Sequence, residues 1–470
     1  MKKKSDWRTR FIRLCAVVLP LIVLCFTACK DEDKEENLPF DPTKPVVITD
    51  FSPKSGGIGN NIILYGENFG NDPKKLKVIV GGKEANIISV KNNILYCVVP
   101  RMATEGDVEI SVYDDNGEEV AFAEAEEKFT YVKQWLVSTL AGQRFENEKD
   151  AFQGEGAFDA CGCIKGATWF SFDPKSNFDH LYLTCYNISS IRLIDLEEKT
   201  VTMQASLSAT GDKPAIINWT VDENQDMIIS RDLGKDGNVN VLKTRASEFK
   251  SEVKLGNSKQ QAAVGAFVHP QTGNIYYALY KDQSIYEYKF EDKTTNVIAS
   301  HPRVRETLRM VVHPTGKYAY LLRQYNERGN GYISRMDYNS TANQFTTPYI
   351  VAGSDGVGSR VQMNGPTQGV FVKNPEYAGE EDEYDFYFCD ERNHCIRILT
   401  PTGRVVTFAG RGNDSSDPGF ANGALRSEAR FAYPWALAYD EKRKCFYVGE
   451  RGMNRDGKEQ AVIRKIAMEE

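Results

Sequence analysis

The feature that most limits the fold is a repeat that begins near Trp135 and continues to the end of the 470-residue chain. Val137–Gly142 recurs as Tyr349–Gly353 and again as Val405–Gly410, and each copy is a short strand-like run that ends in Ala-Gly. Each repeat unit opens with two strand-like runs, a first and a second strand, that are joined by a turn, and such pairs occur six times in this region. The six first strands are expected to begin near Gly166, Ala215, Ala263, Arg309, Gly369 and Ala436.

The two ends of the repeated region predict how it closes. The last unit ends with Ala461–Ile466 and lacks a fourth strand, whereas Leu136–Ala141 is a spare strand ahead of the first unit. We expect Leu136–Ala141 to complete the last of six blades, because closure removes exposed sheet edges. Cys389–Arg397, with a loose copy at Cys185–Arg192, and the opening segment Ala429–Ala438 resemble the NHL family of β-propellers. The propeller is therefore expected to span residues 135–470.

A different pattern occupies residues 45–132. Seven short alternating runs separated by turn signals predict an immunoglobulin-like sandwich. The motifs Phe51–Gly57, Leu64–Gly70 and Phe129–Tyr131 resemble the IPT/TIG family, in which such a module commonly acts as a spacer. Gly66 and Gly70 are expected to bracket a turn that packs Phe69 inward. The predicted fold class is all-β, with this sandwich followed by a six-bladed NHL-type β-propeller.

The N-terminus predicts export and a membrane anchor. A basic segment is followed by the apolar run Leu14–Phe26, which is short for a bilayer span. Phe26–Cys29 resembles a bacterial lipobox, and the acidic run 30–36 resembles the surface-export signal of Bacteroides-type lipoproteins. We expect residues 1–28 to be a lipoprotein signal peptide, Cys29 to be lipidated, and residues 29–44 to be a flexible tether. The alternative is an ordinary inner-membrane anchor helix.

Composition and motifs do not point to catalysis. The formal net charge of −7 gives no basic field for nucleic acid. The sequence lacks a Gly-x-Ser-x-Gly elbow, a His-Glu-x-x-His motif and a phosphate-binding glycine loop. His269 and His313 lie in repeated His-Pro turns, and they and His394 are expected to be structural. Most cysteines are expected to be buried, with room for one or two disulfides. No catalytic residue, metal or cofactor is predicted.

A ligand site is predicted on one face of the propeller. In a propeller, the loops after the second strands share a face with the blade-to-blade connections. Aromatic rings and planar hydrogen-bonding groups at that face suit a sugar, and arginine suits a carboxylate or sulfate. The candidate ligand-binding residues are Tyr186, Asn187, Arg231, Lys281, Arg323, Tyr325, Arg392, Tyr433, Trp435 and Arg451, with Trp169 and Trp219 nearby. Alternatively, the charges are used in blade-to-blade ion pairs with Asp232, Asp282 or Glu450, and Trp169, Trp219 and Trp435 belong to the core.

The resemblance implies a function at the cell surface. A lipoprotein anchor, a TIG spacer and an NHL propeller resemble the surface glycan-binding proteins of polysaccharide-utilisation systems. The protein is expected to sit in the outer membrane through its lipid alone. There it would bind a polysaccharide or oligosaccharide and present it to a SusCD-type TonB-dependent transporter. The alternatives are a propeller lyase or hydrolase that acts on glycan or peptide, and a protein-docking scaffold of the uptake complex.

Overall fold

The computed structural model describes residues 38–469 except 144–153, 163, 165, 186–187, 208–212, 233–238, 256–261, 280–283, 301–307, 324–330, 354–362, 413–416 and 456–457. The chain divides into two compact units, Met1–Val132 and Lys133–Glu470, and the described part of each is built of strands and short 3-10 turns. Residues 1–28, Cys29 and most of the predicted tether lie outside the described part. Among the residues described, no helix has the length and apolar character needed to cross a membrane.

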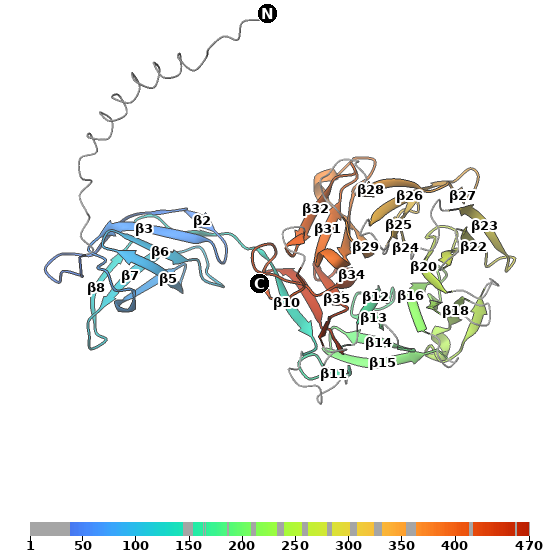
Figure 1. The fold of residues 1–470 in the computed structure, drawn as a ribbon, viewed down its shortest axis with the longest axis horizontal. Coiled ribbons are helices and arrows are strands. Elements are labelled where there is room, and N and C mark those ends of the chain that lie inside the picture. The colour runs from blue at the N-terminus through green and yellow to red at the C-terminus, as the bar shows by residue number, and fades with distance from the viewer. Residues whose placement is uncertain are drawn as a thin grey trace, which may run out of the picture. The chain divides into compact units, whose positions relative to one another are not determined.

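The first unit is an immunoglobulin-like sandwich (Figure 1). The strand order is β1-β3-β6-β5-β4-β7-β8, and β5 joins the two layers because Lys83–Ala85 pair with β4 while Asn86–Lys91 pair with β6. A parallel pair, β2 and β9, and a 3-10 turn, η1, complete it. The strands are β1 (Val47–Ser52), β2 (Ser55–Gly56), β3 (Asn61–Glu67), β4 (Leu76–Val80), β5 (Lys83–Lys91), β6 (Ile94–Val98), β7 (Val108–Tyr113), β8 (Glu119–Glu124) and β9 (Thr130–Tyr131), and η1 is Pro73–Lys75.

The core of this unit confirms the predicted glycine turn. Phe69 is 1% exposed and packs so tightly that a Cβ on Gly66 would lie 2.4 Å from its ring. Gly70 has a φ of +77°, and a Cβ there would lie 2.9 Å from the backbone nitrogen of Phe40. Phe51 and Phe129, whose ring centroids are 6.4 Å apart, fill the core beside this turn. The two glycines therefore allow the backbone and Phe69 to approach each other closely.

The second unit is a six-bladed β-propeller, as predicted (Figure 1). The strands of each blade are antiparallel, and the inner strands β12, β16, β20, β24, β29 and β34 contact one another in that order around the ring. Blade 1 is β12 (Ala167–Phe172), β13 (His180–Cys185), β14 (Ser190–Asp195) and β15 (Thr200–Ser206), with β11 (Gly156–Ala157) at its edge. Blade 2 is β16 (Lys213–Trp219), β17 (Met227–Asp232), β18 (Asn240–Lys243) and β19 (Val253–Leu255), with η2 (Arg245–Ser247). Blade 3 is β20 (Ala263–Val268), β21 (Ile275–Leu279), β22 (Ser284–Tyr288) and β23 (Thr295–Ser300).

The other three blades follow the same plan. Blade 4 is β24 (Leu308–Val312), β25 (Tyr318–Arg323) and β26 (Tyr332–Asn339), whose outer partners are β27 (Gln344–Phe345) and β28 (Tyr349–Gly353). Blade 5 is β29 (Pro366–Lys373), β30 (Tyr384–Asp390), β31 (Cys395–Leu399) and β32 (Val405–Ala409), with η3 (Pro375–Tyr377) and η4 (Glu391–Asn393). Blade 6 is β34 (Pro434–Asp440), β35 (Cys445–Glu450), β38 (Ile463–Met468), β10 (Trp135–Ala141) and β33 (Gly423–Ala424), and β36 (Met453–Arg455) pairs with β37 (Lys458–Gln460).

The ring closes as predicted. Strand β10 pairs antiparallel with β38, from Trp135 opposite Met468 to Ala141 opposite Ile463. The first strand of the propeller thus becomes the outer strand of its last blade, so that the two ends of the domain hold each other.

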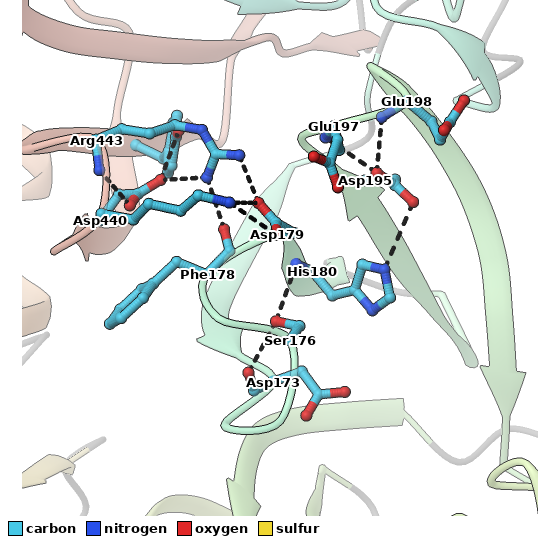
Figure 2. A network of polar contacts seen from close by, with 12 residues as sticks. Asp173, Ser176, Phe178, Asp179, His180, Asp195, Glu197, Glu198, Asp440 and Arg443 are labelled. Carbon is cyan, nitrogen blue, oxygen red and sulfur yellow. Dashed lines mark hydrogen bonds and ion pairs between the residues drawn. The ribbon is translucent and has the colours of Figure 1, made fainter.

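Ion pairs reinforce the junction between blades 6 and 1 (Figure 2). Arg443 Nη2 lies 2.6 Å from Asp179 Oδ1, and Arg443 Nη1 lies 3.0 Å from the fully buried Asp440. Lys442 Nζ also lies 2.7 Å from Asp179. These two cations lower the pKa of Asp179, because they stabilise its charged form.

Side chains satisfy the inner edges of the ring. An inner strand has a partner on one side only, so the backbone groups on its other edge need different partners. Gln368 supplies several of them, because its Oε1 accepts from Phe170 N (2.8 Å) and Leu437 N (3.2 Å) and its Nε2 donates to Phe170 O (2.7 Å). One side chain of blade 5 therefore ties together the inner strands of blades 6 and 1.

The described cysteines are buried, and two histidines contact neighbouring blades. Cys97, Cys161, Cys185, Cys389, Cys395 and Cys445 are buried and form no disulfide within the described part of the chain, and Cys163 lies outside the described residues. His269 is fully buried, and its Nε2 lies 3.1 Å from the carbonyl oxygen of Gly316 in the next blade. His313 of blade 4 packs edge to face against Phe371 of blade 5, with ring centroids 4.9 Å apart. The two His-Pro turns thus hold neighbouring blades together.

Candidate ligand-binding face

One face of the propeller is defined by strand register. In every blade, the last residue of the second strand pairs with the start of the inner strand, which places both at the same end of the blade. We call this the connection face. The pairs are Ala167 with Cys185, Lys213 with Asp232, Ala263 with Leu279, Leu308 with Arg323, Pro366 with Asp390, and Pro434 with Glu450.

Two guanidinium groups lie on Trp435 at this face. The Cζ of Arg451 is 5.0 Å from the Trp435 ring centroid, and the Cζ of Arg309 is 5.8 Å from it. Arg309 Nη1 also donates a 2.7 Å hydrogen bond to the carbonyl oxygen of Val264 in blade 3. Arg309 of blade 4 therefore contacts both blade 3 and blade 6, which are opposite each other in a ring of six.

Arg451 is the most open member of this group. Its side chain is 32% exposed, and its Nη1 lies 3.3 Å from Oε1 of Glu391, which is 5% exposed. On its other side Arg451 lies against Gly166, where a Cβ would be 3.3 Å from the Cγ of Arg451. Trp435, Glu391 and Gly166 thus fix a guanidinium group that still reaches solvent. Such a group offers planar N–H donors to a carboxylate, a phosphate or a sugar hydroxyl.

Tyr433 is held in place by His394 of blade 5. The backbone N–H of Tyr433 donates to His394 Nδ1 at 3.2 Å, and the two rings meet edge to face at 4.5 Å. Tyr433 has a φ of +53° and is only half-buried. This contact fits the structural role expected for His394. The backbone of Tyr433 is also tied to Arg451, whose backbone N–H donates to the Tyr433 carbonyl oxygen at 2.8 Å.

Buried ion pairs lie beneath the surface of the connection face and hold its loops in place. Arg464 lies 3.1 Å from Glu450, and Arg397 lies 2.6 Å from Asp390, with all four side chains at most 1% exposed. Glu450 Oε1 also accepts from the Ala432 N–H, and Arg464 donates to the carbonyl oxygens of Arg430 and Ala421. Asp390 accepts from the Asn364 N–H in the same way. These pairs hold the blade-to-blade connections, and Glu450 is engaged by Arg464.

The other predicted residues are distributed as follows. Arg231 is fully buried, and Arg323 is 3% exposed with its Cζ 4.9 Å from the Tyr332 ring centroid. Arg392 is exposed on η4. Two tryptophans follow the alternative prediction and belong to the core. Trp169 is buried and its Nε1 donates to Ile217 O, and Trp219 packs against the same core as the last residue of β16, at the end away from the connection face. Tyr186, Asn187, Lys281 and Tyr325 lie outside the described residues.

Sequence reasoning missed Arg309, Gln368, Glu391, Arg397 and Arg464. A signal for the two buried arginines was present, because Ile-Arg recurs at the third strand of three blades as Ile191-Arg192, Ile396-Arg397 and Ile463-Arg464. Within the described ranges, no group of three or more His, Cys, Asp or Glu residues has the arrangement of a metal site.

Comparison with known proteins identifies the relatives. Residues 45–131 match the IPT/TIG domain family. Two solved structures from Bacteroides are auxiliary nutrient binding proteins: one from B. thetaiotaomicron VPI-5482 is 43% identical with a TM-score of 0.81, and one from B. ovatus ATCC 8483 is 39% identical with a TM-score of 0.65. Each comparison covers 92% of this chain and 100% of the other.

A third structure, named as a candidate phosphatase of B. thetaiotaomicron VPI-5482, is 32% identical over 93% of this chain and 99% of that chain, with a TM-score of 0.77. Among curated proteins, no match was found. The chain therefore belongs to the same family as these Bacteroides auxiliary nutrient binding proteins, with an IPT/TIG domain followed by a six-bladed β-propeller.

Proposed function

We propose that this protein binds a nutrient glycan on the connection face of its propeller. Two relatives that match almost the whole chain are named for nutrient binding, which favours a binding role over a catalytic one. The observation that carries the proposal is Arg451, whose guanidinium group lies on Trp435 and pairs with Glu391 while the side chain as a whole is 32% exposed.

The chemistry of this group suits a sugar. Trp435 is only 5% exposed, so it acts as the support on which Arg451 lies rather than as an open platform. Arg451 supplies planar donors, Glu391 supplies an acceptor, and the half-buried Tyr433 adds an aromatic side chain. A sugar ring carries hydroxyl groups that donate and accept hydrogen bonds, so it can satisfy both charged groups together.

The site would work at the cell surface. We propose that Cys29 carries the lipid anchor in the outer membrane, and that the protein presents its glycan to a SusCD-type transporter. A weak site is sufficient for this task, because a polymer offers many copies of the same sugar and rebinds before it diffuses away. Replacement of Cys29 by Ala should release the protein from the membrane, as measured by fractionation. A Cys29→Ala protein that stays at the surface would contradict the anchor.

Retardation in native gels tests the glycan directly. The full-length protein, purified in detergent, is run through gels that contain starch, arabinoxylan, pectin, α-mannan or chondroitin sulfate. At least one polymer should slow the protein, and Arg451→Ala should weaken that effect tenfold or more in dissociation constant. Lys293→Ala is the control, because Lys293 is exposed in the turn between β22 and β23 of blade 3. Equal retardation of both variants would place the site elsewhere.

A phosphate ester is the second candidate ligand. Two guanidinium groups on one tryptophan favour it, because arginine binds phosphate oxygens in pairs, and one relative is named as a candidate phosphatase. Turnover of p-nitrophenyl phosphate by the protein, lost in Arg451→Ala, would support this activity. Polymer binding without turnover would support the glycan.

A further inference from the structure

A second cavity lies at the opposite end of the blades. It has a volume of about 450 Å³ and lies between blades 4 and 5, where the turn after β24 meets the segment that contains η3. This end of the blades is the turn face. The polar and aromatic side chains that line the cavity include His313, Tyr318, Arg335, Tyr377, Glu380 and Asp382.

The floor of the cavity offers a donor next to an acceptor. The hydroxyl group of Thr315 lies 2.7 Å from His313 Nδ1, and the backbone N–H of Thr315 donates to the same nitrogen at 3.2 Å; Nδ1 is therefore assigned as the acceptor and Nε2 as the protonated nitrogen of the neutral ring. Burial lowers the pKa of His313, which keeps the ring neutral at physiological pH. The His313 side chain is only 3% exposed, yet its Nε2 makes no hydrogen bond to the described residues. The nearest carboxylate oxygen, Asp382 Oδ1, lies 3.4 Å away. A buried donor that lacks a good acceptor is costly unless a ligand or water completes it.

The surrounding groups hold the acceptor in place. Tyr318 donates from its hydroxyl group to Asp382 Oδ2 at 2.7 Å, and the Tyr384 N–H donates to Oδ1 at 3.1 Å. The Asp382 carboxylate is therefore oriented before any ligand arrives. Preorganised groups of this kind add affinity, because less freedom is lost on binding.

The walls combine aromatic and charged side chains. The Cζ of Arg335 lies 3.7 Å from the Tyr318 ring centroid, and its Nε is fixed by Asp337 at 2.6 Å. Tyr377 on the opposite wall is half-buried and donates to Asp385 at 3.3 Å, and Glu380 beside it is exposed. The cavity thus surrounds its ligand with donors, acceptors and rings, which is the composition of a site for a polyhydroxylated molecule.

We propose that this cavity is a second sugar-binding site, which takes a single sugar unit of a glycan. A hydroxyl group can accept from His313 Nε2–H while it donates to Asp382, because each carboxylate oxygen has a lone pair beyond the one that accepts from Tyr318 or Tyr384. The proposal rests on the proposed function as a glycan-binding protein and extends it to two sites at opposite ends of the blades. Two sites would let one propeller engage two stretches of polymer and raise its avidity.

The test counts sites by saturation-transfer NMR and calorimetry on the full-length protein in detergent. The probes are maltotriose, cellotriose, mannotriose, xylotriose and trigalacturonic acid. The wild type should bind at least one probe at two sites. Tyr377→Ala and Glu380→Gln should each weaken one site fivefold or more and leave the other unchanged, whereas Arg451→Ala should weaken only the other. Glu223→Gln, in the corresponding exposed turn of blade 2, is the control and should change neither.

The outcomes separate the two proposals. A single site that Arg451→Ala abolishes and Tyr377→Ala does not affect would overturn the second site alone. A single site that depends on Tyr377 and Glu380 but not on Arg451 would support the cavity and overturn the connection face. Absence of binding to every probe, together with absence of retardation in the polymer gels, would overturn both.

Discussion

The guanidinium carbon of Arg309 lies 5.8 Å from the ring centroid of Trp435, and these two residues come from the inner strands of blades 4 and 6. Because Arg309 also donates to Val264 O in blade 3, it connects inner strands on opposite sides of the ring. Gln368 makes a second set of connections, from blade 5 to Leu437 in blade 6 and to Phe170 in blade 1. Polar side chains thus organise the centre of a ring whose blades have apolar cores.

Removal of the Gln368 amide should destabilise the propeller. Gln368→Ala leaves the N–H and C=O of Phe170 and the N–H of Leu437 without their partner, and unsatisfied buried groups cost about 1–3 kcal/mol each before relaxation. We expect the free energy of unfolding to fall by about 2–4 kcal/mol, measured by chemical denaturation. Gln344→Ala, at an exposed position in β27, is the control. A loss of less than 1 kcal/mol for Gln368→Ala would show that these backbone groups need no partner from Gln368.

Closure by β10 should decide whether the ring stays intact. Val137 is buried and pairs with Ile466, whereas Thr139 on the same strand is exposed. Val137→Asp buries an unpaired charge in the last blade and should cost about 3 kcal/mol or more, with rapid proteolysis of the propeller. Thr139→Asp should change stability by less than about 1 kcal/mol. If the two variants resist protease equally, β10 is not the strand that closes the ring.

The contact between Arg443 and Asp179 should make stability depend on acid pH (Figure 2). The pKa of Asp179 is lowered below its usual 3.8 by Lys442 and then Arg443. A carboxylate whose folded pKa is depressed contributes stability above its unfolded pKa, and that contribution disappears as the pH falls through the folded value. Asp179→Asn should lower the free energy of unfolding by about 1 kcal/mol at pH 7. Near pH 2 the variant and the wild type should be equally stable, as measured by thermal denaturation at several pH values. The same loss at both pH values would assign the effect to packing rather than charge.

Much of the fold could be predicted because its signals are local. Alternating runs and turn residues repeat along the chain, and a spare strand before the first blade implies the closure with β38. Strand β8 was missed for a physical reason: its inward positions are the small residues Ala121 and Ala123, whereas Val120 and Phe122 point outward and are about half exposed. The usual contrast between a large apolar inner face and a polar outer face is therefore absent.

The site was less accessible to sequence reasoning. The sequence could nominate Trp435 and Arg451, because both lie at strand ends on the predicted face. It could not show that Arg309 reaches Trp435 from two blades away, or that Glu391 pairs with Arg451, because these contacts depend on the curvature of the ring. The sequence left open whether Trp219 lies near this face or in the core, because an aromatic residue in a first strand can lie near either end of it.

The most direct test of the account is the affinity of Arg451 variants for the polymer that retards the wild type. Arg451→Lys keeps the charge but loses the planar group on Trp435, so we expect it to weaken binding about tenfold, and Arg451→Ala at least as much. Trp435→Leu should weaken binding similarly, because it removes the support of Arg451. Affinity gels and calorimetry should show these losses with an unchanged melting temperature for the Arg451 variants. Wild-type affinity in both Arg451→Lys and Arg451→Ala would contradict a glycan site on the connection face.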